Sequence, residues 1–171
     1  MKTFLLMTTF PWLAIAEPYV FPSLTFSNLN GQEVAMPGGL AGERANLVLV
    51  AFLQKQQKDV DTWLKPLPAI QRAYPGFRYY ELPTIKRMNA LVRYFIANGM
   101  RGGIPDKEQR GRTITLHIDK EPFKKALGIT SESTIHAFLI DKSGKVLWRQ
   151  EGLFTEAKGK SLEDALAASA R

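Results

Sequence analysis

Two hydrophobic periods run through the chain, one typical of buried strands and the other of amphipathic helices. Residues 47–53, LVLVAFL, form a continuous apolar run of strand length, which is typical of a strand buried on both faces. Residues 58–73 then carry apolar side chains at helical spacing, with a break expected at Pro66 and Pro68. The same reasoning predicts strands at 77–83, 113–118, 134–140 and 145–152, and helices at 88–100 and 121–127.

The ends of the chain and the connections complete this picture. Two short strands are expected on either side of the turn pair Asn30-Gly31. Ser161 is expected to cap a final helix, and residues 101–112 read as a polar loop. In the helix at 88–100, the face formed by Leu91, Val92, Phe95 and Ile96 is expected to point inward. The order predicts an α/β fold: a three-layer sandwich with a central mixed sheet, helices on both faces and an N-terminal β-hairpin.

The first sixteen residues, MKTFLLMTTFPWLAIA, have the features of an export signal. Lys2 precedes an apolar stretch that ends in Ala14-Ile15-Ala16, a pattern that signal peptidases accept. We therefore predict a signal peptide at 1–16 and one domain at 17–171, with a periplasmic or secreted location. The alternative is that 1–16 forms a buried N-terminal strand or helix, in a mitochondrial or cytoplasmic protein.

Charge is distributed unevenly along the chain, whose formal net charge is +7. Between residues 86 and 125 the acidic side chains are Asp106, Glu108, Asp119 and Glu121. The basic side chains of the same segment are Lys86, Arg87, Arg93, Arg101, Lys107, Arg110, Arg112, Lys120, Lys124 and Lys125. A positive field there would attract an acidic protein surface, anionic lipid headgroups or a small anion, although a solvated surface explains the same pattern. Nucleic acid is not expected, because residues 100–125 lack the interleaved aromatic side chains of a stacking surface.

The composition excludes several kinds of chemistry. The sequence has no cysteine, so it offers no thiolate for catalysis, disulfide exchange or metal binding. Its two histidines, His117 and His136, fall in predicted strands and have no carboxylates at metal-binding spacing. Asp119 is expected to cap the helix that follows it rather than to act in catalysis. We expect no cofactor, no metal and no enzymatic activity.

Three stretches resemble the thioredoxin-like superfamily. They are FSNLNGQEVAMP, NLVLVAF and the hairpin region TIHAFLIDKSGKVLWRQEG. In that family a reactive cysteine lies at the corner after the strand that NLVLVAF resembles, whereas here residues 54–57 read Gln-Lys-Gln-Gln. The amide side chains of glutamine cannot act as thiolates but can donate and accept hydrogen bonds. The resemblance thus implies a thioredoxin-like domain without redox chemistry, in which this corner binds a partner or packs.

A narrower resemblance concerns YYELPTI, the long segment RYFIANGMRGGIPDKEQRGRTITLHIDKEPFKKALGI and the stretch FLIDKSGKVLWRQEG. Together they are similar to the ATP synthase assembly factor family called "ATP ten". That resemblance implies a non-catalytic protein-binding or assembly-chaperone domain, here in the cell envelope, with a subunit of a membrane complex as its partner. We expect the domain to be a monomer.

The residues expected to bind the partner combine the basic segment with the glutamine corner. They are Arg101, Lys107, Arg110, Arg112, Gln54, Gln56 and Gln57. Arginine suits this role because its planar guanidinium binds carboxylates through two hydrogen bonds. The alternative is a cysteine-free enzyme or small-anion-binding protein in which Arg101 and Arg112 hold the anion.

Overall fold

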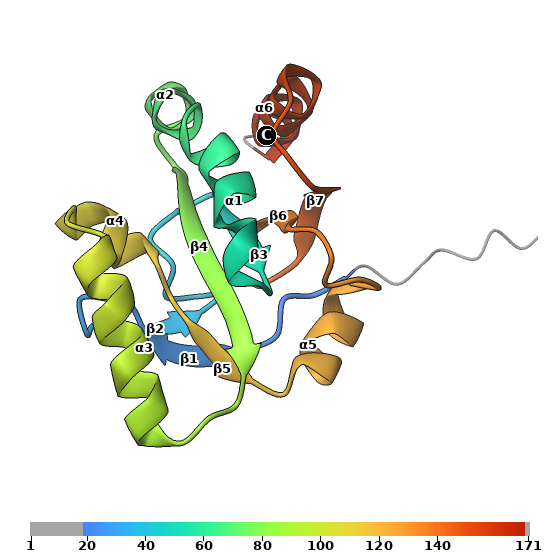
Figure 1. Cartoon of the computed structure of the whole chain (residues 1–171). Helices are drawn as coiled ribbons and strands as arrows, with labels where there is room; N and C mark the ends of the chain where they lie inside the picture. The colour runs from blue at the N-terminus through green and yellow to red at the C-terminus, as the bar shows by residue number, and fades with distance from the viewer. Residues whose placement is uncertain (1–18, 170–171) are drawn as a thin grey trace, which may run out of the picture.

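The computed structural model describes residues 19–169, and within them the strands form a hairpin and a mixed sheet (Figure 1). The hairpin joins β1 (Leu24–Ser27) to β2 (Glu33–Met36), as expected around Asn30-Gly31. The second sheet has five strands in the order β5-β4-β3-β6-β7. They are β3 (Ala45–Ala51), β4 (Phe77–Lys86), β5 (Leu116–Ile118), β6 (His136–Ile140) and β7 (Val146–Glu151). β3, β4 and β5 run parallel to one another, whereas β6 and β7 are antiparallel to their neighbours, so the sheet is mixed as predicted.

Helices connect the strands and cover the sheet. A short 3-10 helix, η1 (Gln54–Gln56), leads directly into α1 (Gln57–Leu64), and α2 (Leu67–Ala73) begins after Pro66, where the break was predicted. The others are α3 (Ala90–Gly103), α4 (Lys107–Arg112), α5 (Lys120–Leu127) and α6 (Glu156–Ser169). Asp119 caps α5 as predicted, because its carboxylate accepts a hydrogen bond from the backbone N–H of Glu121. Within residues 19–169 no helix is both long and apolar enough to cross a bilayer.

Alternate residues of β3 and β6 face opposite sides of the sheet and build two cores. Leu47 and Leu49 pack on one side with Trp63 of α1, Leu67 of α2 and Leu162 of α6. The opposite side is covered by the hairpin and by α5, through the buried side chains Val48, Val50, Met36, Phe123 and Leu127. The α/β architecture with covered faces and an N-terminal hairpin is therefore confirmed.

Three local predictions were wrong. Residues 101–112 are not a loop, because α3 continues to Gly103 and α4 occupies Lys107–Arg112, capped by the side chain of Asp106. Ser161 does not cap the last helix, since α6 begins at Glu156, and its hydroxyl instead accepts a hydrogen bond from the indole N–H of Trp148. Leu91, Val92 and Phe95 are not buried, for they are 65%, 39% and 65% exposed. The predicted signal peptide at 1–16 lies outside the described residues.

Trp63 is the largest side chain buried between α1 and the sheet. It is fully buried, packs edge-to-face against Phe154 at 5.2 Å and Trp148 at 6.1 Å between ring centroids, and donates its indole N–H to the carbonyl of Gly152 over 2.9 Å. The indole thus links α1 to the segment between β7 and α6, which carries the chain back over the sheet.

We predict that Trp63→Phe lowers the free energy of unfolding by about 2 kcal/mol, because it leaves a void and removes the donor to Gly152. Trp148→Phe is the matched control. Its ring is only half-buried, so we expect a loss of about 1 kcal/mol or less. Urea denaturation of both variants measures the difference, and equal losses would contradict the central role of Trp63.

Candidate functional site

The corner between β3 and α1 (residues 54–57) is held together by the side chain of Gln56. Its carbonyl oxygen accepts hydrogen bonds from the backbone N–H groups of Phe52, at 2.8 Å, and Leu53, at 3.1 Å. Its amide nitrogen donates to the carbonyl of Glu132 over 2.8 Å. Because Gln56 is 2% exposed, these bonds replace water for three backbone groups. Of the three glutamines predicted to bind a partner, Gln56 therefore has a structural role.

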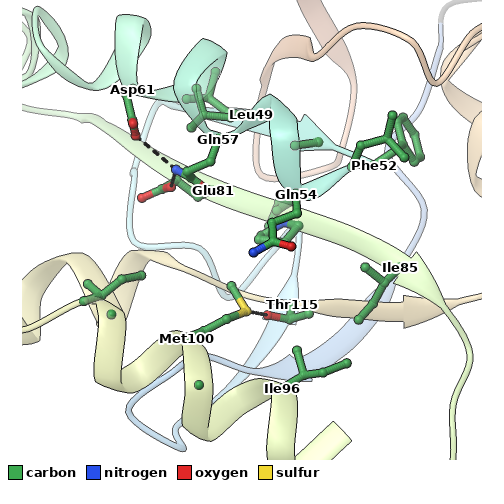
Figure 2. A pocket seen from close by; sticks show the side chains of 18 of the residues that line it. Leu49, Phe52, Gln54, Gln57, Asp61, Glu81, Ile85, Ile96, Met100 and Thr115 are labelled. Atoms are coloured by element: carbon green, nitrogen blue, oxygen red, sulfur yellow. Dashed lines mark hydrogen bonds between the residues drawn. The ribbon is translucent and has the colours of Figure 1, made fainter. Parts of the chain in front are cut away.

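Gln54 and Gln57 both line a cavity next to the corner, and both are exposed. Figure 2 shows Gln54 extending from the corner toward Met100 of α3 and Thr115. Gln57 points the other way and donates hydrogen bonds to the carboxylates of Asp61 and Glu81, each over 3.1 Å. These two glutamines are thus available to contact a molecule in the cavity.

The cavity has a volume of about 860 Å³ and lies between the corner and α3. Its floor is formed by the ends of β3 and β4, with Ala51, Pro83 and Ile85, and its far wall by α3. The α3 residues at the wall are Ile96, Gly99, Met100 and Gly103, which recur at helical spacing and so lie on one face of the helix. A pocket of this size is in the range that accommodates small organic ligands or partner side chains.

Glycine explains why a space remains beneath α3. At Gly99 and Gly103, a Cβ atom built on the backbone would meet no heavy atom within 4 Å. Two of the four α3 residues that face the cavity are thus glycines, and none of the residues of α3 is buried. Its bulky side chains Leu91, Tyr94 and Phe95 fall on the opposite face and are exposed. This arrangement corrects the predicted inward face of α3.

Glu81 is the one carboxyl group among the described residues that is almost completely buried at the cavity wall, with 4% of its surface exposed. It lies on β4 opposite Leu49, and its oxygens accept hydrogen bonds from Gln57, at 3.1 Å, and from Gln109 of α4, at 3.4 Å. Burial raises the pKa of Glu81 above its ordinary value, and the two glutamine hydrogen bonds oppose this effect. Glu81 was not predicted from the sequence, although an acidic residue between Tyr80 and Leu82 in a predicted strand was a possible signal.

The predicted arginines contact the chain itself. Arg101 donates to the carbonyl of Leu29 over 2.9 Å, which joins α3 to the hairpin. Arg110 donates to the carbonyls of Ile104 and Pro105 at the end of α3 and to the side chain of Asn30. These bonds fix the positions of α3 and α4.

Arg112 and Lys107 lie further along the same segment. Arg112 pairs with Glu108 over 2.5 Å, and its guanidinium stacks 4.6 Å from the centre of the Tyr79 ring. Lys107 has an exposed side chain. The structure brings the four basic residues together around α4, but within residues 19–169 none of them lines the cavity beneath α3.

Neither histidine belongs to a metal-binding arrangement in the described part of the chain. His117 lies in β5, and burial together with the nearby charge of Arg93 lowers its pKa. His136 lies in β6, where one ring nitrogen is 2.8 Å from the carbonyl oxygen of Ser131. Within residues 19–169 no three His, Asp or Glu side chains gather closely enough to hold a metal ion.

We predict that Gln56→Ala lowers the free energy of unfolding by about 2–4 kcal/mol, because it leaves the Phe52 and Leu53 N–H groups and the Glu132 carbonyl without their partner. Gln54→Ala is the matched control at the same corner. Its side chain is exposed, so we expect a change of about 0.5 kcal/mol or less. Chemical denaturation distinguishes the two, and a small effect at Gln56 would show that the corner does not depend on it.

A second prediction concerns the dependence of stability on pH. Because the folded state raises the pKa of Glu81, it binds more protons than the unfolded chain above the ordinary carboxyl pKa of 4.5. The stability from this group is therefore present at low pH and lost as pH rises through the pKa of the folded state. Glu81→Gln should remove that loss, so the free energy of unfolding of the wild type should fall relative to that of the variant as the pH rises above the ordinary carboxyl pKa of 4.5.

The control for this measurement is Glu156→Gln, which changes an exposed carboxyl group of α6. Its unfolding free energy should follow that of the wild type across the same range. If the unfolding free energy of Glu81→Gln also followed that of the wild type, the pKa of Glu81 would be the same in the folded and the unfolded chain.

The sequence matches no protein-family model, and no curated protein matches it. Solved structures do match. The thioredoxin domain of a thiol-disulfide oxidoreductase from Bacteroides vulgatus is 17% identical with a TM-score of 0.58, over 90% of this chain and 99% of that one. A thiol:disulfide interchange protein from Bacteroides sp. is 16% identical with a TM-score of 0.57, over 89% and 91% of the two chains.

A member of the Sco family of cytochrome c oxidase assembly proteins is 18% identical with a TM-score of 0.55, over 91% of this chain and 98% of that one. The comparisons do not show a relation to the ATP synthase assembly factors. At these identities the likeness establishes the architecture and not the activity. The chain has a thioredoxin-like fold, as its sequence predicted.

Proposed function

We propose that this protein is a non-catalytic thioredoxin-like module that binds a protein partner through the outer face of α3. The observation that carries the proposal is the exposure of Leu91, Tyr94 and Phe95, which are 65%, 63% and 65% accessible. These three side chains form what we call the α3 surface. Isolated apolar side chains are common on protein surfaces, but clustered large apolar and aromatic ones mark interaction sites.

The α3 surface has the composition of a binding site. The rings of Tyr94 and Phe95 lie edge-to-face with centroids 6.0 Å apart, so they present a joined aromatic area. Aromatic residues are enriched in the cores of protein interfaces, where they bury a large area at low entropic cost. Figure 1 shows α3 at the edge of the molecule, where a partner can approach it without displacing another element.

The charge around α3 favours an acidic partner. Between residues 82 and 105 the sequence has no aspartate or glutamate, whereas Lys86, Arg87 and Arg93 are exposed on or just before α3. A positive rim around an apolar centre speeds association with an acidic surface and selects against basic ones. Lys107 is exposed at the start of α4, beyond the C-terminal end of α3, while Arg101 and Arg110 hold that end of α3 in place.

Several features support binding without catalysis. The sequence has no cysteine, so the corner where redox-active relatives hold their thiol has no group for disulfide exchange. Gln56 uses its hydrogen bonds within the corner. We extend the proposal to an assembly role at a membrane complex of the cell envelope, which rests on the export-type N-terminal sequence and the resemblance of the 93–129 segment to assembly factors.

The experiment compares matched serine substitutions. Leu91→Ser combined with Phe95→Ser should reduce recovery of the native partner in affinity purification by about tenfold or more, as expected when central apolar contacts are lost. The thermal stability should remain unchanged because both side chains are exposed. Leu153→Ser, at a 51% exposed leucine that precedes α6, serves as the control and should recover the partner normally.

Equal recovery of the same partners by the wild type and the double variant would exclude the α3 surface as the binding site. Photo-crosslinking from position 94 gives an independent reading. The partner should be captured from this position and not from position 160, an exposed residue of α6.

A further inference from the structure

The cavity beneath α3 has apolar walls and an acidic end. Aliphatic and thioether side chains of Ile85, Ile96 and Met100 face it from β4 and α3. Its ionisable lining within residues 19–169 consists of the carboxyl groups of Asp61 and Glu81, which Figure 2 shows beside Gln57. No lysine or arginine of these residues lines it. The cavity therefore has the opposite charge character to the exposed basic side chains Lys86, Arg87 and Arg93.

The negative charge at this end has no cationic partner in direct contact. Among the described residues, Glu81 forms no ion pair, and the guanidinium of Arg112, whose charge opposes the rise in the Glu81 pKa, is paired with Glu108 and stacked on Tyr79. The carboxyl group of Asp61 adds a second negative charge close by. Burial favours the neutral form of Glu81, whereas a cation in the cavity favours the ionised form, so Glu81 and Asp61 together select a positively charged group over a neutral or negative one.

The carboxyl group of Glu81 also keeps unused hydrogen-bonding capacity. Each of its oxygens accepts one hydrogen bond from an amide, from Gln57 and Gln109 respectively. A carboxylate offers about four acceptor positions, so roughly two remain. An ammonium group has three donors, so it can donate to Glu81 and to Asp61 at the same time.

We propose that the cavity beneath α3 binds a small cationic amphiphile, a molecule with one protonated amine and an aliphatic body. The amine lies against Glu81 and Asp61, and the body extends between the corner and the Ile96 and Met100 side chains. This site is distinct from the α3 surface, because it lies on the opposite face of the same helix. The proposal goes beyond protein binding and does not depend on it.

Other ligand classes fit the cavity less well. A carboxylate or phosphate would meet two carboxyl groups and no base among the described lining residues, which costs binding energy through like-charge repulsion. A neutral aliphatic molecule would pack against the apolar walls but would offer no positive charge to Glu81 and Asp61. These differences predict an order of affinity: alkylammonium, then the neutral alcohol, then the carboxylate.

The test uses n-octylammonium, octan-1-ol and octanoate as probes of equal chain length, titrated into the whole chain by calorimetry. Methyl NMR signals of Ile96 and Met100 report whether the probe occupies the cavity. We expect n-octylammonium to bind about tenfold or more tightly than octanoate, and to shift both methyl signals. Octanoate binding as tightly as the amine, or no shift at either methyl group, would overturn the proposal.

Three variants make the test specific. Glu81→Gln should weaken n-octylammonium binding by about tenfold or more and leave octan-1-ol binding nearly unchanged. Gly99→Leu should block every probe, because its new side chain enters the cavity from α3 without meeting other atoms. Gly102→Leu is its matched control on the same helix, since Gly102 has equally open surroundings but does not line the cavity.

Two of the variant results can contradict the proposed amine site. If Gly99→Leu folds and still binds n-octylammonium like Gly102→Leu, the amine binds elsewhere and the proposal is wrong. If Glu81→Gln binds the amine as tightly as the wild type, the carboxyl group does not recognise it and the ligand class is wrong. Loss of partner recovery in the α3 surface variants, by contrast, tests the proposed function alone.

Discussion

The hydrogen bonds of the Gln56 side chain determine how the chain turns from β3 into α1, and the other features of the site depend on that turn. One buried amide satisfies the N–H groups of Phe52 and Leu53 and reaches across to the carbonyl of Glu132, so the end of the central strand is tied to the segment before β6. A fixed turn places Gln57 one residue later against Glu81. The corner therefore keeps its shape without a thiol. Its polar side chains Gln54 and Gln57 line the cavity.

The position of α3 is the second determinant of the site. Glycines on its inner face leave space above β4, while Arg101 and Arg110 hold its C-terminal end to the hairpin and to the start of α4. The helix is thus anchored by polar contacts at one end instead of by a buried apolar stripe. Such an element has few apolar contacts to resist small displacements, which is typical of segments that move on binding.

The elements that depend on local signals were predicted correctly from the sequence. The predictions were wrong where the position of a side chain depends on how distant elements pack. The β3 run, the Asn30-Gly31 turn and the Asp119 cap were predicted correctly, because each depends on neighbouring residues. The burial of α3 was predicted wrongly because an amphipathic pattern shows that a helix has an apolar face, but not that another element covers it.

The candidate site was predicted in part. Gln54 and Gln57 do line the cavity, whereas Gln56, identical in type, is structural, because only the fold decides which side chains of a turn point inward. Helix α4 was not predicted, because residues 101–112 are polar and rich in glycine, and its start depends on the capping side chain of Asp106. The role of Glu81 depends on contacts from α1 and α4, which lie far apart in the sequence.

The two proposed sites share α3, and this has a thermodynamic consequence. A ligand in the cavity contacts α3 where its glycines leave space, and so it favours one position of the helix over others. A partner bound to Leu91, Tyr94 and Phe95 also selects a position of the same helix. If the two prefer the same position, each must raise the affinity of the other by the same factor, because coupling between binding sites is reciprocal.

The amount of coupling is limited by how differently the ligand binds the alternative positions of α3. An amine held at Glu81 by its charge, with its body against Ile96 and Met100, contacts both the rigid sheet and the helix, and so it is well placed to discriminate between them.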